Sequence, residues 1–255
     1  MKSVTLDHVI GLTKRIAREI YRDNLFIFNL ALGPLITLYI VKICADSLAK
    51  IPFLRDFMPM DALAIGFICL IIHFNGYVLC TLVIIRERVS GTLERVFMAT
   101  FRRHEVLLGY LFGYSLIMLA QTIIVMVASK FMFRITYGRN LPLIFAMIFL
   151  LGVVSIALAM FVSNFARREA HAMISIPLIL LPAFLLGGLI FPVEVLPRWL
   201  QAASFAFPLR YANIPIQKAL IEGGGFADVW PHVAGLAAYG VVMIFLGSLT
   251  LKDRQ

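Results

Sequence analysis

Charged residues are scarce in this sequence, and their scarcity excludes a water-soluble globular domain. Asp, Glu, Lys and Arg make up 15% of the 255 residues and hydrophobic residues 61%, whereas soluble domains have about 25% charged and roughly 45–50% apolar residues. The apolar residues form blocks between Leu25 and Leu251, and a transmembrane helix needs about 20 such residues. No stretch remains for a separate soluble domain, so we expect one all-α integral membrane domain over residues 1–255.

Motifs for catalysis, metal binding and phosphate binding are also missing. The three cysteines, Cys44, Cys69 and Cys80, show no CxxC spacing, which argues against a disulfide framework or a zinc knuckle. No GxxxxGK[ST] loop occurs, and Gly223–Gly225 are not followed by a lysine that could bind phosphate. No nucleophile motif and no cleavable signal peptide is visible. We therefore expect no catalytic, cofactor-binding or metal-binding residues, and a chain that is not an enzyme by itself.

Six apolar blocks predict six transmembrane helices, with an amphipathic helix before the first. The predicted spans cover residues 25–44, 62–85, 106–129, 141–164, 171–190 and 233–251. Residues 5–23 place apolar side chains on one helical face and Lys14, Arg15, Arg18 and Arg22 on the other. This pattern is typical of a helix that lies in the membrane interface.

The distribution of basic residues predicts the orientation in the membrane. An even number of spans places both termini on one side, and that side holds 14 of the 23 Lys and Arg residues. By the positive-inside rule this side is cytoplasmic, although the loop with Lys130, Arg134 and Arg139 opposes the assignment. The net charge of +9 is explained by contact with anionic lipid headgroups, so we expect membrane lipid and no nucleic acid as a partner.

Residues 86–110 form the most informative segment. The second span ends in charges, and Ser90–Thr92 then break the helix and offer side-chain oxygens that can cap a new one. Leu93, Val96 and Phe97 would form the apolar side of a short helix at the cytoplasmic membrane surface. A soluble partner could reach a helix in that position.

This segment resembles the cytoplasmic signature of the type-2 ATP-binding-cassette export permeases, the ABC-2 type transporter transmembrane proteins. The resemblance rests on Glu87-Arg88, Gly91-Thr92-Leu93-Glu94, Ala99-Thr100 and Leu107-Leu108-Gly109. It implies that residues 91–100 form a coupling helix that docks in a cleft of a separate ATPase subunit. The coupling residues that it implies are Glu87, Arg88, Gly91, Thr92, Leu93, Glu94, Val96 and Phe97.

A second stretch, before the last span, is similar to the external segment of the same family, which forms short re-entrant helices. The matching residues are Gly187-Gly188, Phe191-Pro192, Leu196-Pro197, Trp199-Leu200, Pro208-Leu209 and Tyr211-Ala212. Of these, Phe191, Pro192, Pro197, Trp199, Pro208 and Tyr211 are the candidate residues of the external re-entrant segment. Val89, Phe101, Phe207 and Arg210 depart from the family pattern, which commonly has Glu, Pro, Asn and Thr there.

Small and polar residues recur on one face of the second span. They are Ala62, Gly66, Cys69, His73, Gly76 and Cys80. The face could line a substrate path or a dimer interface, because polar groups avoid lipid, or it could pack tightly against a neighbouring helix. Gln121 of the third span belongs to the same candidate set. We favour packing at a bundle or dimer interface. We do not expect a zinc site at Cys69, His73 and Cys80, because a closed zinc site needs about four ligands.

The resemblance implies the permease subunit of an ATP-driven exporter in the inner membrane of a prokaryote. A separate ABC ATPase would bind ATP and magnesium, and a second permease chain would complete a homodimer or related heterodimer. Mostly apolar spans favour an amphipathic or hydrophobic substrate, such as a drug-like molecule, a lipid or a lipid-linked glycan.

Three other functional classes make different demands on the sequence. A secondary transporter or channel should contain buried ionisable residues for coupling, and the spans offer little beyond His73. A membrane enzyme should show clustered catalytic residues, and none is recognisable. A non-transporting membrane anchor for an ATPase stays open.

Overall fold

The computed structural model describes residues 2–22, 24–48, 50, 60–92, 103–166, 168–189, 192–221 and 223–250. All regular secondary structure in these residues is helical. The longer helices are α1 (Lys2–Arg22), α2 (Asn24–Leu48), α4 (Met60–Val89), α6 (Arg103–Phe133), α7 (Leu141–Ser163), α8 (Glu169–Leu186), α10 (Pro208–Ile221) and α11 (Phe226–Thr250). The short helices are η1 (Gly138–Asn140), η2 (Val193–Val195) and α9 (Arg198–Ser204).

Five of the described helices are long and apolar enough to cross a membrane, namely α2, α4, α6, α7 and α11. The predicted fifth span, residues 171–190, coincides with α8, whose apolar part Met173–Leu186 is shorter. This helix stops early because Gly188 adopts a left-handed conformation (φ 73°), which is a common way for a helix to end. The count of six spans therefore stays a prediction.

The last helix begins at Phe226, well before the predicted start of the last span at residue 233. Asp228 explains the difference, because its carboxylate accepts a hydrogen bond of 2.9 Å from the Gly225 amide. A negative charge in the first turn also favours helix formation through the helix dipole. Pro231 consequently lies inside α11 and does not belong to the preceding loop.

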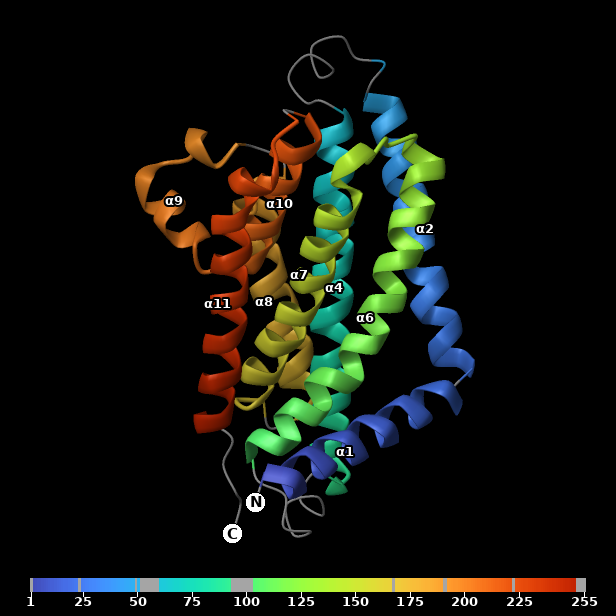
Figure 1. Ribbon diagram of the computed structural model, residues 1–255, viewed down its shortest axis with the longest axis vertical. Coiled ribbons are helices and arrows are strands. Elements are labelled where there is room, and N and C mark those ends of the chain that lie inside the picture. The colour runs from blue at the N-terminus through green and yellow to red at the C-terminus, as the bar shows by residue number, and fades with distance from the viewer. Residues whose placement is uncertain are drawn as a thin grey trace.

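The long helices run side by side and alternate in direction, as Figure 1 shows. α2 ascends, α4 descends, α6 ascends, α7 descends, α8 ascends and α11 descends in this view. The start of α1 and the end of α11 therefore lie at the same, lower end of the bundle. α1 crosses that end obliquely and packs against α6 and α2.

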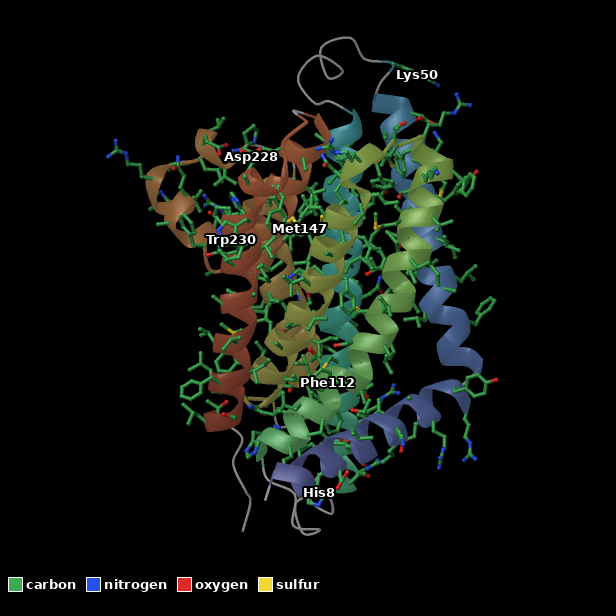
Figure 2. All side chains as sticks on the ribbon, in the orientation of Figure 1. His8, Lys50, Phe112, Met147, Asp228 and Trp230 are labelled. Atoms are coloured by element: carbon green, nitrogen blue, oxygen red, sulfur yellow. The ribbon has the colours of Figure 1, made fainter. Side chains whose placement is uncertain are left out.

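The interior of the bundle is built around α4 and α7, which pack against each other along much of their length. Large side chains of both helices, such as Ile72, Met147 and Leu151, are fully buried in one hydrophobic core; Figure 2 shows Met147 in the interior of the bundle. In contrast, α2, α8 and α11 expose large apolar side chains, for example Ile36, Leu178 and Phe245. Apolar outer faces on this scale suit a bilayer and would be unstable in water.

The predicted external segment contains α9 and α10. α10 packs against α4, α7, α8 and α11, and its Leu209, Ala212 and Ile216 are fully buried. α9 projects from the side of the bundle near the end opposite α1 (Figure 1).

Candidate functional site

The end of α4, where the predicted coupling residues begin, is bound to the end of α7 by Arg88. Its guanidinium group donates hydrogen bonds to the carbonyl oxygens of Ser163 (2.9 Å), Asn164 (3.3 Å) and Ala166 (3.1 Å). It also donates to Asn164 Oδ1 at 3.2 Å. The last carbonyls of a helix lack partners within the helix and favour a cation. Arg88 therefore serves as a side-chain cap for α7.

Asn164 extends this connection to α11. Its side-chain amide donates to the carbonyl oxygen of Gly247 at 2.9 Å and to Thr250 Oγ1 at 3.0 Å. Its own backbone amide bonds within the last turn of α7. The ends of α4, α7 and α11 are thus joined through two side chains, Arg88 and Asn164.

Glu87, the neighbour of Arg88, faces α1. Its Oε1 lies 3.7 Å from Arg15 Nη2, and Arg15 Nε donates to Glu19 at 2.9 Å. Burial alone would lower the pKa of Arg15, but the hydrogen bond to Glu19 and the nearby carboxylates raise it above its ordinary value. Arg15 therefore remains a cation beside Glu87.

The start of α6 is held by the same helix α1. His8 Nδ1 lies 3.0 Å from Glu105 Oε2, and Glu105 is almost fully buried. Thr13 Oγ1 donates to the carbonyl oxygen of Gly109 at 3.3 Å. α1 thus contacts both the end of α4 and the start of α6, the two helix ends that flank residues 93–102.

Two glycines of α6 allow α1 to approach closely. A Cβ atom on Gly109 would lie 2.6 Å from Leu12 Cδ2, and one on Gly113 would lie 2.9 Å from Ile16 Cγ2. Leu12 and Ile16 are themselves buried. Glycines four residues apart are a known means of close helix packing.

Within the predicted coupling helix, the structure describes only Gly91 and Thr92. Gly91 has a φ of 70°, a left-handed conformation that glycine adopts readily. Ser90 Oγ lies 3.0 Å from Thr92 Oγ1. Leu93, Glu94, Val96 and Phe97 lie outside the described residues, so their role stays a prediction.

The candidate path or interface residues of α4 and α6 lie inside the chain. Cys69, His73, Cys80 and Gln121 are at most 1% exposed. His73 Nδ1 lies 2.7 Å from Ser155 Oγ of α7. A Cβ on Gly76 would lie 3.2 Å from the carbonyl oxygen of Gly152, which is also in α7. This face of α4 packs within the chain, and a role in a substrate path stays a prediction.

Two buried polar atoms of this set lack hydrogen-bond partners among the described residues, His73 Nε2 and Gln121 Oε1. The described part of the chain contains no group of three His, Cys, Asp or Glu residues that could hold a metal ion. Cys69, His73 and Cys80 therefore do not form such a group.

In the external segment, Arg210 connects α10 to α9. It donates to the Gln201 carbonyl oxygen at 3.0 Å and to Ser204 Oγ, and its guanidinium lies 3.9 Å from the centre of the Phe205 ring. Tyr211 donates its hydroxyl to the Phe205 carbonyl oxygen at 3.1 Å. The departure from the family pattern at Arg210 thus has a structural role here.

The other candidate residues of that segment lie at different depths. Pro208 is buried, whereas Pro192, Pro197 and Trp199 are exposed, Trp199 at 70%. Phe191 lies outside the described residues. The position of this segment relative to a membrane stays a prediction.

A comparison with protein families decides the family. A model of the ABC-2 type transporter family matches residues 8–221, which is most of the chain. The chain belongs to the ABC-2 type transporter family. With its apolar helices, it is a multi-pass membrane protein.

Several curated relatives resemble this ABC-2 family member. "ABC transporter G family member 20" of Dictyostelium discoideum is 23% identical over 198 residues, 77% of this chain and 27% of that protein. "Probable multidrug ABC transporter permease YbhS" of Escherichia coli K12 is 26% identical over 190 residues, 74% of this chain and 50% of that protein. "Inner membrane transport permease YhhJ" of Escherichia coli K12 is 26% identical over 175 residues, which are 66% of this chain and 46% of that protein. The chain thus spans half or less of the length of these relatives.

Sequence reasoning missed several residues that hold the site of this ABC-2 protein together. Of these residues, Asn164 could most readily have been found from the sequence, because asparagine directly after an apolar span often satisfies backbone groups at a helix end. Arg15 and His8 offered only their place in an amphipathic helix. Nothing in the local sequence indicates that they pair with Glu87 and Glu105.

Proposed function

We propose that the chain is the membrane-spanning permease subunit of an ATP-driven ABC exporter. A separate ATPase subunit binds and hydrolyses ATP with magnesium, and two permease chains and two ATPase chains form the complex. The chain crosses the inner membrane of a prokaryote six times and has both termini in the cytoplasm. Residues 91–100 transmit the movement of the ATPase to the membrane helices.

The observation that carries this proposal is the attachment of α1 to both helix ends beside residues 93–102. Arg15 lies beside Glu87 at the end of α4, and His8 lies beside Glu105 at the start of α6. A force on the coupling segment would therefore move α4, α6 and α1 together. A surface loop without a transmitting role would not need such anchoring at both ends.

The contacts of Arg88 supply a route from the coupling segment to the rest of the bundle. Arg88 binds the end of α7, and Asn164 in turn binds the end of α11. Arg88 and Asn164 act through hydrogen bonds, which hold only over short distances. A displacement of α4 would therefore also move α7 and α11 at the end where the ATPase docks.

The alternation of helix directions supports six crossings. α8 ascends between the descending α7 and α11 in Figure 1, so it acts as the fifth crossing although its apolar part is short. α10, which belongs to the proposed re-entrant segment, packs against it. The richer supply of basic residues at the end with the termini supports a cytoplasmic location of that end.

The substrate is amphipathic or hydrophobic. The outer faces are apolar, and the buried polar residues of the described interior are mostly hydroxyl and amide groups, which suit uncharged cargo. The relative named a multidrug permease agrees with a drug-like molecule, and a lipid or lipid-linked glycan has the same character.

Substitutions in the coupling segment test the proposal. Burying a large apolar side chain at an interface contributes about 1.5–3 kcal/mol, whereas an exposed charge pair contributes about 0–1 kcal/mol. Phe97→Ala should therefore weaken binding of the ATPase roughly tenfold to a hundredfold, and Glu94→Ala should weaken it less. The measurement is quantitative co-purification of the ATPase, together with ATP hydrolysis by the assembled complex.

Val89→Ala is the matched control, because Val89 is exposed at the end of α4 and lies outside residues 91–100. It should leave both binding and hydrolysis unchanged. If Phe97→Ala and Leu93→Ala both bind the ATPase and support transport normally, residues 91–100 are not the coupling element.

A further inference from the structure

A groove lies on the outer surface between α2 and the end of α6, at the end of the bundle opposite α1. It has a volume of about 430 Å³ and is lined by Tyr39, Lys42, Phe131, Met132, Phe133 and Arg134. This volume lies within the range of small-molecule binding sites. The groove shares no residue with the coupling end of the molecule.

The walls of the groove combine exposed aromatic rings with two cations. Phe131 is 77% exposed and Tyr39 is 59% exposed. Lys42 Nζ lies 5.9 Å from the centre of the Phe133 ring and 2.9 Å from Asp46 Oδ2. Asp46 offsets the charge of Lys42, so Arg134 supplies the unbalanced positive charge of the groove.

Arg134 is held in an unfavourable backbone conformation. Its φ of 57° makes it the only non-glycine residue with a positive φ in the described part of the chain. It directly follows the last residue of α6, a position where helices usually have glycine. An arginine at this position strains the backbone, and such strain is typically retained where the side chain has a function.

Arg134 also lacks a hydrogen-bond or ion-pair partner among the described residues, and its side chain is exposed. A soluble anion would need only the cations of the groove. Aromatic rings that face outward beside cations suit a molecule with an anionic head and apolar chains, because Tyr and other aromatic residues favour the membrane interface and bases favour anionic headgroups.

We propose that this groove binds the phosphate headgroup of an anionic phospholipid of the surrounding bilayer. Arg134 and Lys42 contact the phosphate, and Tyr39, Phe131 and Phe133 contact the glycerol and the first part of the acyl chains. The proposal does not depend on the exporter function, because a resident lipid would bind to any membrane protein with this groove.

Native mass spectrometry of the full chain tests the site, with phosphatidylglycerol and phosphatidylcholine offered in equal amounts. Wild-type protein should retain phosphatidylglycerol preferentially. A basic residue at an anionic lipid surface contributes about 1 kcal/mol, so Arg134→Gly and Lys42→Gln should each lower the affinity for phosphatidylglycerol about fivefold.

Arg134→Gly separates lipid binding from folding. Glycine relieves the strained conformation, so the unfolding temperature in phosphatidylcholine alone should be unchanged or higher while phosphatidylglycerol binding falls. Arg139→Gln is the matched control, because Arg139 is an exposed base of the same loop that does not line the groove. It should leave lipid retention unchanged.

Three outcomes would overturn the proposal. One is retention of phosphatidylglycerol by Arg134→Gly at the wild-type level, and another is an equal loss in Arg139→Gln, which would indicate unspecific attraction. The third is displacement of the bound lipid by excess inorganic phosphate, which would mean that the groove recognises the anion and not the lipid.

Discussion

Arg88 stabilises the fold by capping the end of α7 with a guanidinium group that contacts three carbonyl oxygens and one side-chain amide oxygen. Hydrogen bonds that involve a charged group contribute about 1.5–3 kcal/mol. Arg88→Gln should therefore lower the free energy of unfolding by about 2–3 kcal/mol. Arg88→Lys should have a smaller effect because it keeps the charge. It should still be less stable than the wild type, because a lysine cannot reach all the acceptors at once. Unfolding of the purified chain in detergent measures both values.

Arg86→Gln is the control for this prediction. Arg86 lies two residues earlier on α4 and is exposed, and its side chain has no hydrogen-bond or ion-pair partner in the described part of the chain. Its loss should change stability by less than about 0.5 kcal/mol. An Arg88→Gln protein as stable as Arg86→Gln would contradict the cap.

At the scale of elements, the packing of α1 on α6 depends on two glycines. Gly109→Ala and Gly113→Ala would place a methyl group 2.6–2.9 Å from Leu12 and Ile16, and such overpacking costs about 1–3 kcal/mol. Each substitution should lower the unfolding temperature and reduce cross-linking between cysteines introduced on facing positions of α1 and α6. The double variant Gly109→Ala/Leu12→Ala should lose less stability than the sum of the single variants.

Gly11→Ala provides the control on the same pair of helices. Gly11 is exposed on α1, and a methyl group added there would have no neighbouring atom within 4 Å. Alanine is favoured over glycine in helices by about 1 kcal/mol, so this variant should be slightly more stable than the wild type. Equal losses in Gly11→Ala and Gly109→Ala would contradict the close-packing explanation, because no neighbouring atom opposes a methyl group at Gly11.

For the whole molecule, the long helices run between two opposite ends of the bundle, and we expect these ends to lie on opposite sides of the membrane. Cysteines introduced at Lys14 of α1 and Arg168 between α7 and α8 should react with an impermeant maleimide only from the cytoplasm. Cysteines at Lys50 and Asp228, at the other end of the bundle in Figure 2, should react only from the exterior. Cys44 is exposed and is first replaced by serine.

Reaction of all four positions from one side would contradict the crossing of the bundle. Reaction of Lys14 and Arg168 from the exterior would instead reverse the orientation. The buried Cys69 and Cys80 serve as internal controls, because they should stay unlabelled in the folded protein.

The sequence by itself determined the membrane class, the existence of the long helices and the family resemblance. Apolar blocks and amphipathic periodicity are local patterns, so they are readable without knowing what a helix contacts. The same holds for residues 5–23, where apolar side chains on one helical face and basic ones on the other predicted an amphipathic helix; α1 spans Lys2–Arg22. The family match over residues 8–221 confirmed the resemblance that Glu87-Arg88 and Gly91–Glu94 had indicated.

Only the tertiary structure decided which groups meet. Arg88 and Asn164 are 76 residues apart, and His8 and Glu105 are 97 apart, so no local pattern could pair them. The sequence alone showed that small and polar residues share one face of α4. The burial of this face against α7, at Gly76 and Gly152, follows from the packing of the whole bundle. The groove with Arg134 likewise exists because α2 and α6 end beside each other, which depends on how the helices assemble and not on either helix alone.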